Sequence, residues 1–135
     1  MKTNFKKTNF NENYAEIHID NNNKILKLIW KGFVNFEEYK YIFDNAYQIF
    51  KKNKLKFWIS DMTNGKVVPS KAQEWLRDIY IPKIVAIGLI KVVFIVEKNI
   101  FRKVYSDYIK EIINLNGAEL MYMYDENKAI KWFNS

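Results

Sequence analysis

The sequence predicts a single α/β domain on a five-stranded mixed β-sheet, with the element order ββαβαβαβα. Two observations lead to this prediction: strand-like and helix-like segments alternate along most of the chain, and the first two strands follow each other as a hairpin. Alternation implies parallel neighbouring strands joined by right-handed crossovers, and the hairpin supplies an antiparallel edge. The length of 135 residues suits one domain with one core.

Five segments have the patterns of strands. In residues 14–20 apolar and polar side chains alternate, and the three asparagines at 21–23 favour a turn into a second strand. The segment LKFWIS is apolar on both faces, which is typical of a central strand. The expected strands are residues 14–20, 24–32, 55–60, 91–97 and 119–124.

Four helices are expected between and after these strands. Asn35 and Glu38 form a capping box, and an apolar stripe follows them. Ser70 and Gln73 form a second capping box, and Pro82 is expected to kink or restart the helix that follows, because proline donates no hydrogen bond. The expected helices are residues 36–52, Ser70 to about Gly88, 100–115, and a short helix capped by Asp125.

Composition limits the classes of protein that fit. The chain has no cysteine, which excludes disulfides, thiolate catalysis and zinc–sulfur sites. Residues 1–12 have the composition of a flexible tail before a domain at 13–135, and they lack the apolar core of a signal peptide. We therefore expect a cytoplasmic protein.

Two features could suggest a membrane protein or a nucleic-acid-binding protein, but their details favour neither class. Residues 79–96 are mostly apolar, but they contain Pro82, Lys83, Gly88 and Lys91, so a membrane span is not expected. The net charge of +7 is spread over the chain, which favours a solvated surface over nucleic-acid binding.

Four stretches carry a resemblance to a known family: LIWKG and FWISDM at two strand ends, EWLRDIYIPKIVAIGLIKVVFIV, and YDENKAIKWF at the end. Together with the element order, they resemble STAS domains and their SpoIIAA-like or STAS/SEC14-like relatives over residues 14–133. The resemblance implies helices mainly on one face of the sheet, with a doubly wound arrangement as the alternative.

The resemblance also implies a functional loop after the strand 55–60. In STAS domains this loop carries a phosphorylatable hydroxyl residue within a pattern of Asp, Ser or Thr, and Gly. Here the matching sequence is DMTNG. Asp61 and Gly65 fit the pattern, Met62 occupies the hydroxyl position, and Thr63 stands one place late. Thr63 is therefore the candidate phosphorylation site.

Ligands of open α/β sheets bind at the carboxyl ends of the strands, which places the candidate site at residues 61–69, 97–101 and the turn after Ser70. We interpret the loop as a recognition surface for a ligand or partner. The alternative is that Asp61 only accepts hydrogen bonds from the loop and fixes its turn. The candidate residues are Asp61, Thr63, Asn64, Gly65, Ser70, Glu74 and Trp75.

Signals for catalysis, metal or cofactor binding are weak. His18, the single histidine, falls on the polar face of an edge strand. Glu74 and Asp78 share a helix face, but Arg77 and Lys71 beside them indicate a salt-bridged surface. No glycine-rich phosphate loop occurs. We therefore expect no catalytic residue, no metal and no cofactor.

The expected function is that of a non-enzymatic, STAS-like module that binds a protein or a small ligand and has a regulatory role. The first alternative is the binding of a lipid or another apolar molecule, as the SEC14-like side of the resemblance implies. The second is an acid–base enzyme that uses Asp61 with Glu74 or Asp78. The segment ELMYMY is a candidate apolar sheet edge, so a homodimer is also considered.

Overall fold

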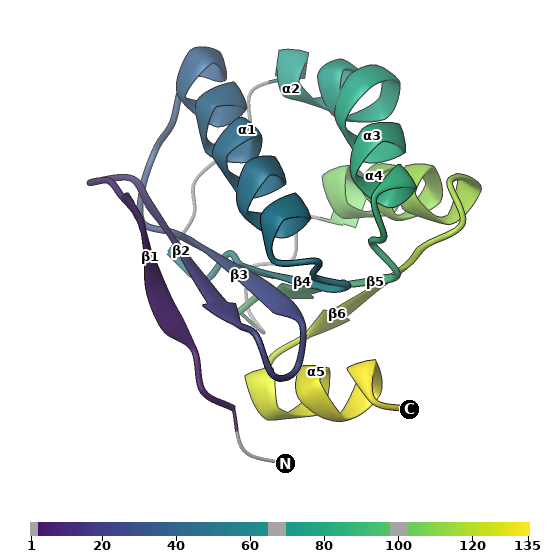
Figure 1. The fold of residues 1–135 in the computed structure, drawn as a ribbon. Coiled ribbons are helices and arrows are strands. Elements are labelled where there is room, and N and C mark those ends of the chain that lie inside the picture. Colours follow the sequence, from purple (N-terminus) through teal and green to yellow (C-terminus); the bar gives the residue numbers. More distant parts are fainter. Residues whose placement is uncertain (1–2, 65–69, 98–102) are drawn as a thin grey trace.

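The fold is built on one mixed sheet of six strands, in the order β1-β2-β3-β4-β5-β6 (Figure 1). The computed structural model describes residues 3–64, 70–97 and 103–135. β1 pairs with β2 and β2 with β3 in antiparallel register, and the remaining pairs are parallel. The α/β class and the opening hairpin are thus confirmed. The strands are β1 Lys6–Asn11, β2 Ala15–Asp20, β3 Ile25–Trp30, β4 Phe57–Asp61, β5 Lys91–Ile95 and β6 Glu119–Met123.

The expectation of five strands is wrong, because the stretch interpreted as a tail contains β1. Its backbone pairs with β2, and the Thr8 hydroxyl donates to the carbonyl of Ile17 at 2.8 Å. Phe10 is buried, and its ring lies 5.7 Å from that of Tyr41. A strand with one buried apolar side chain has a weak sequence signal, and pairing with its neighbour supplies the rest of its stability.

The helices are α1 Phe36–Lys52, α2 Ser70–Trp75, the π-helical turn η1 Leu76–Tyr80, α3 Ile81–Ala86, α4 Lys103–Leu115 and α5 Glu126–Phe133. α1 begins after the predicted capping box, in which Asn35 and Glu38 exchange hydrogen bonds. The predicted start of the third helix, at residue 100, lies outside the described residues. No helix in the described part of the chain has the length and apolar character that crossing a membrane requires.

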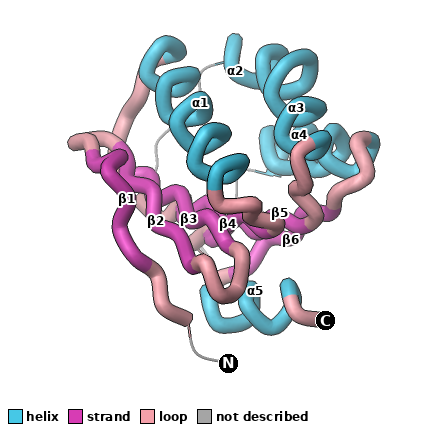
Figure 2. Tube along the Cα trace, viewed as in Figure 1, coloured by secondary structure: helices cyan, strands magenta, loops and turns pink. Residues whose placement is uncertain are grey.

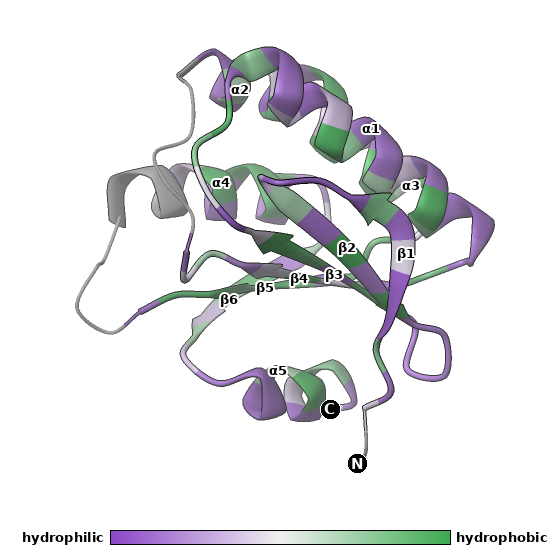
Figure 3. Cartoon of the chain, turned by 90° about the vertical axis from the view of Figure 1, so that its left-hand side faces the viewer, coloured by the Kyte–Doolittle hydropathy of each residue, from purple (hydrophilic) through white to green (hydrophobic). Residues whose placement is uncertain are grey.

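The order of the strands explains where the helices lie. Neighbours in the sheet are neighbours in sequence, so each right-handed crossover between parallel strands passes over the same face. α1, α2, α3 and α4 accordingly cover one face (Figure 2). α5 follows the last strand, is not part of a crossover, and covers the other face (Figures 1 and 3).

Each face of the sheet has its own apolar core, and strand alternation divides β4 between them. Trp58 faces α1 and belongs to the larger core, whereas Phe57 and Ile59 face α5 and pack with Ile130 and Phe133. β4 lies between β3 and β5, as expected for an apolar central strand. This alternation determines which residues reach the candidate site.

The helix predicted from Ser70 to Gly88 is interrupted before Pro82, as expected. The backbone N–H of Ile81 bonds to the carbonyl of Leu76, five residues back, which is the spacing of a π-helix. The wider turn accommodates Pro82, whose ring would otherwise crowd the carbonyl four residues earlier. The chain leaves the helix through Gly88, whose φ of 121° favours glycine.

Candidate functional site

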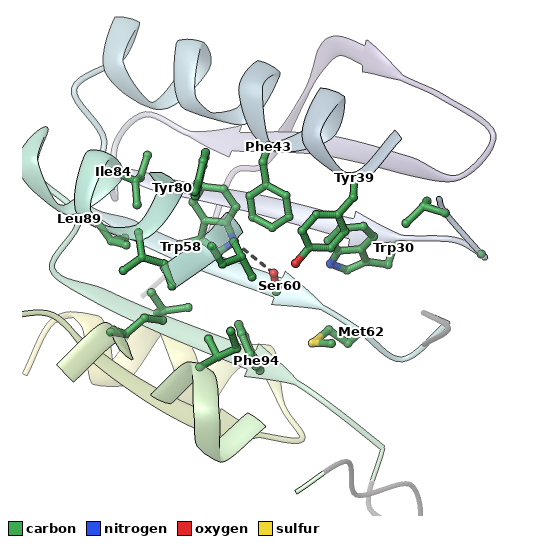
Figure 4. A pocket seen from close by; sticks show the side chains of 17 residues that line it. Trp30, Tyr39, Phe43, Trp58, Ser60, Met62, Tyr80, Ile84, Leu89 and Phe94 are labelled. Carbon is green, nitrogen blue, oxygen red and sulfur yellow. Dashed lines mark hydrogen bonds between the residues drawn. The ribbon is translucent and has the colours of Figure 1, made fainter. Parts of the chain in front are cut away.

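A cavity of about 70 Å³ lies between the helical layer and the sheet (Figure 4). Residues of α1, η1, α3 and α4 line it on the helix side, and the helix-facing residues of β3, β4 and β5 line it on the sheet side. Of its 17 lining residues, 15 are buried, and only Gly32 and Met62 are partly exposed. These two residues follow β3 and β4, so the cavity approaches solvent at the carboxyl ends of the parallel strands.

Six of the 17 residues that line the cavity are aromatic, and most of their rings contact one another. Phe43 of α1 stacks on Trp58 of β4 at 5.8 Å between centroids, and it meets Tyr80 edge-on at 4.9 Å. Tyr39 packs between Phe43 and Trp30, at 4.6 and 5.5 Å. Rings from four elements thus pack against one another around the cavity. The aromatic lining residues are Trp30, Tyr39, Phe43, Trp58, Tyr80 and Phe94.

The polar groups of the cavity are few and uncharged. The indole N–H of Trp58 donates to Ser60 Oγ at 3.2 Å, and Ser60 is 4% exposed. Figure 4 shows this bond, and it shows the hydroxyl of Tyr39 directed into the cavity. Within the described part of the chain, no charged side chain lines the wall. The site is suited to an uncharged molecule.

Tyr80 is a buried lining residue with an unusual hydroxyl. Its oxygen has no hydrogen-bond partner among the described residues. Burial raises the pKa of Tyr80 well above its ordinary value, and the nearby Asp44 and Tyr47 raise it further. The phenol therefore stays neutral at physiological pH and is a poor acid–base group.

The predicted loop residues Asp61 and Thr63 lie together, but not in the cavity. Asp61 shares the strand phase of Phe57 and Ile59, which face α5. Its Oδ1 accepts hydrogen bonds from the backbone N–H of Thr63 at 3.2 Å and from the Thr63 hydroxyl at 2.8 Å. This geometry agrees with the alternative in which Asp61 fixes the turn. Asn64 is exposed beside it.

The other predicted site residues are dispersed. Trp75 is half-buried and packs on Tyr80 at 5.3 Å, behind the cavity wall, and Glu74 is exposed. Asp78 is paired with Arg77 at 2.7 Å, which lowers the pKa of the Asp78 carboxyl. Gly65 and residues 98–101 lie outside the described residues, as does the side chain of Ser70, which begins α2. Among described residues, no group of three metal-ligating side chains is close enough to hold an ion.

Sequence reasoning placed the candidate site at the carboxyl ends of the strands, which is the edge that the cavity approaches, but it did not predict the cavity. Its distinguishing polar residue is Ser60, the hydroxyl at the end of an otherwise apolar strand. Ser60 and Met62 share the phase of Trp58, so both face the helices and line the cavity. A polar residue in the buried phase of a central strand was the available signal.

A second hollow, of about 610 Å³, lies between β1 and α1. Its lining is rich in asparagine and lysine, and it includes Asp20, whose carboxylate is already engaged by the hairpin turn. It has the features of an open, solvated groove rather than of a ligand pocket.

Comparisons of the chain with protein-family models, with curated proteins and with solved structures find no match. The resemblance to STAS domains therefore stays a prediction from the sequence.

Proposed function

We propose that this protein is a non-enzymatic, STAS-like module of the cytoplasm that binds a small, mainly apolar molecule in the cavity beneath α1 and η1. The cavity itself is the observation that supports this proposal. It approaches the surface at the carboxyl ends of β3 and β4, where ligands bind in open α/β sheets. Fifteen of its lining residues are already buried in the structure without a ligand, which favours a preformed site.

The volume favours a small molecule over a lipid. Pockets for drug-sized ligands measure roughly 300–1,000 Å³, whereas this cavity measures about 70 Å³. A whole acyl chain requires α1 and α3 to move away from the sheet, which would separate the stacked rings of Phe43 and Trp58. The lipid-binding alternative therefore demands a rearrangement that the small-ligand proposal does not.

The side chains of the cavity support binding rather than catalysis. The hydroxyls of Ser60, Tyr39 and Tyr80 are its principal polar groups, and the raised pKa of Tyr80 keeps that phenol neutral. Asp61 is held by Thr63, and Asp78 by Arg77. Two of the carboxylates proposed for an acid–base enzyme are thus engaged in local contacts, and the third, Glu74, is exposed and does not line the cavity.

A protein partner at the same edge of the sheet is the second candidate. Phe33, next to the cavity residue Gly32, is 70% exposed, and a protein partner bound at this edge would cover it. Phosphorylation of Thr63 would remove the hydroxyl that donates a hydrogen bond to Asp61 and would place two negatively charged groups side by side. The modification would therefore open this turn and so regulate binding at the edge.

Xenon provides the test of the cavity, because it enters apolar cavities without needing a hydrogen bond. With ¹³C-labelled methyl groups, we expect saturable chemical-shift changes at Ile84 and Ile113, which line the cavity. Ile130, which packs on the opposite face, should not respond. The absence of a saturable response at Ile84 and Ile113 would contradict the proposal.

Two neighbouring valines provide a matched pair of variants. Val92 lines the cavity, and Val93 faces the core under α5. Val92→Ile adds a methyl group into the cavity and should weaken xenon binding several-fold. Val93→Ile adds the same group to a filled core, so it should leave xenon binding unchanged while lowering stability by about 1 kcal/mol.

Mass spectrometry of protein from its natural host then distinguishes a small ligand from a bound lipid.

A further inference from the structure

We propose that the ligand of the cavity carries a carbonyl or ether oxygen, and that this oxygen accepts a hydrogen bond from the Ser60 hydroxyl. This inference rests on the proposed function, because it specifies the chemical class of the molecule that the cavity holds. Its basis is the hydrogen bond from Trp58 to the Ser60 oxygen, which leaves the hydroxyl proton of Ser60 free to be donated to another group.

The bond between Trp58 and Ser60 fixes the role of the serine oxygen. An indole N–H only donates, so Ser60 Oγ is the acceptor in this 3.2 Å contact. The serine proton must therefore point to another group. Among the described residues, Ser60 Oγ has no acceptor for that proton, although the side chain is only 4% exposed. A buried hydroxyl donor without an acceptor is unfavourable, and an acceptor on a ligand removes this cost.

The backbone around Ser60 offers no alternative. β4 is paired on both sides, with Leu28 of β3 and Phe94 of β5 opposite Ser60. Among the described residues, no backbone carbonyl accepts a hydrogen bond from the Ser60 hydroxyl. On the helix side, the cavity wall includes the stacked rings of Phe43 and Trp58, whose carbon atoms are not hydrogen-bond acceptors. Figure 4 shows the Ser60 oxygen at the cavity wall, bonded to the indole of Trp58, so we infer that the free proton of the hydroxyl points into the cavity.

Size and charge restrict the acceptor further. Since a water-sized atom needs about 10–15 Å³ of such space, the cavity of 70 Å³ accommodates roughly five to seven non-hydrogen atoms. No charged side chain of the described chain lines the wall, so an ionised ligand would lose its hydration without compensation. The ligand class is therefore a short, uncharged molecule such as a small ketone, aldehyde or ether.

Two probe molecules of matched shape distinguish the contribution of the hydrogen bond to affinity from that of the apolar contacts. Butan-2-one carries a carbonyl oxygen, and 2-methylbut-1-ene has a methylene group in its place. Binding of both is measured by methyl NMR at Ile84 and Ile113, with the full chain. In Ser60→Ala we expect the affinity for the ketone to fall about tenfold relative to that for the alkene, as expected for one lost hydrogen bond. Ser60→Thr retains the hydroxyl and should retain the preference for the ketone.

Vibrational spectroscopy of the wild-type protein tests the same bond without a substitution. The carbonyl stretch of bound ¹³C-labelled butan-2-one should shift to lower frequency than in an alkane solvent. An unshifted stretch, or an unchanged ratio of affinities in Ser60→Ala, would overturn the role of Ser60 while leaving xenon binding and the proposed function intact. If neither probe nor xenon gives a saturable response, the proposed function fails together with this inference.

Discussion

Asp20 shows how one buried carboxylate organises a turn rich in asparagine. It ends β2 and is 1% exposed. Its oxygens accept hydrogen bonds from the backbone N–H groups of Asn22 and Asn23 at 3.0 Å, from the Asn23 amide at 2.7 Å, and from the N–H of Asn4 at 3.1 Å. Burial raises the pKa of Asp20, but these hydrogen bonds lower it by more, so the net shift is downward.

We expect Asp20→Asn to lower the free energy of unfolding by about 2–4 kcal/mol at pH 7, because an amide NH₂ would face N–H donors. Since the pKa is lowered in the folded state, the contribution of Asp20 is complete above its unfolded pKa of about 3.9 and is lost as the pH falls through the folded value. Urea unfolding from pH 7 to pH 3 should therefore show the gap to the wild type narrowing below about pH 4.

Asp44→Asn is the control for that series, because Asp44 is an exposed carboxylate on α1. Its effect on stability should stay within about 0.5 kcal/mol at neutral pH. A gap between Asp20→Asn and the wild type that does not change with pH would show that the charge of Asp20 is not what stabilises the turn.

The candidate site illustrates what the residue pattern could and could not predict. The apolar run ending at Ser60 correctly indicated a central strand and its carboxyl end. Choosing between Ser60 and Asp61 required knowing which phase of the strand faces the helices, and a strand that is apolar on both faces does not reveal it. The cavity also depends on how the rings of Phe43 and Tyr80 meet, which is a property of packing rather than of sequence spacing.

Among the secondary-structure elements, local signals were reliable and non-local ones were not. The helix predicted at 36–52 is found with those bounds, because Asn35 and Glu38 lie within one turn of its start. β1 was missed because its stability comes from pairing with β2 and from one side chain, Phe10, that reaches α1. A segment of lysine and asparagine has no local preference that indicates such pairing.

Phe10→Ala tests whether that side chain anchors β1. Phe10 is 6% exposed and packs against Tyr41, so its removal should cost about 3 kcal/mol of stability. Asn9→Ala, at the exposed neighbouring position, should change stability by less than about 0.5 kcal/mol. Urea unfolding of both variants measures the difference. Equal effects would indicate that backbone pairing alone holds β1 on the sheet.

The molecule as a whole is a three-layer arrangement, and Lys91 holds the carboxyl end of its last layer, α5. The ammonium of Lys91, at the start of β5, donates to the carbonyl of Trp132 at 2.9 Å and lies 4.9 Å from the centroid of that indole ring. A cation at this end of a helix satisfies free carbonyl groups and complements the helix dipole. Phe133 adds apolar contact, stacking on Phe57 at 4.7 Å.

We expect Lys91→Met to loosen α5 without unfolding the sheet. The loss of this charge-assisted contact should lower stability by about 1–2 kcal/mol and speed amide exchange in α5 more than in β4. Lys128→Met, which removes an exposed charge on α5, is the control and should leave exchange unchanged. Hydrogen-exchange mass spectrometry gives both readouts. Uniform acceleration over all elements would mean that α5 and the sheet open together.

The strand order β1 to β6 also has a consequence for how the chain acquires its structure. Every strand joins the one made immediately before it, so no pairing has to wait for a distant part of the chain, and loop-closure entropy stays small at each step. After β3, the sheet grows during synthesis from the N-terminus by one strand at a time, and each new strand is preceded by the helical segment that covers it. The face that α5 covers is completed last, because α5 follows β6, the last strand of the sheet. Until then, Ile59 and Val93 stay open to solvent, which makes this face the one that a chaperone would contact on the nascent chain.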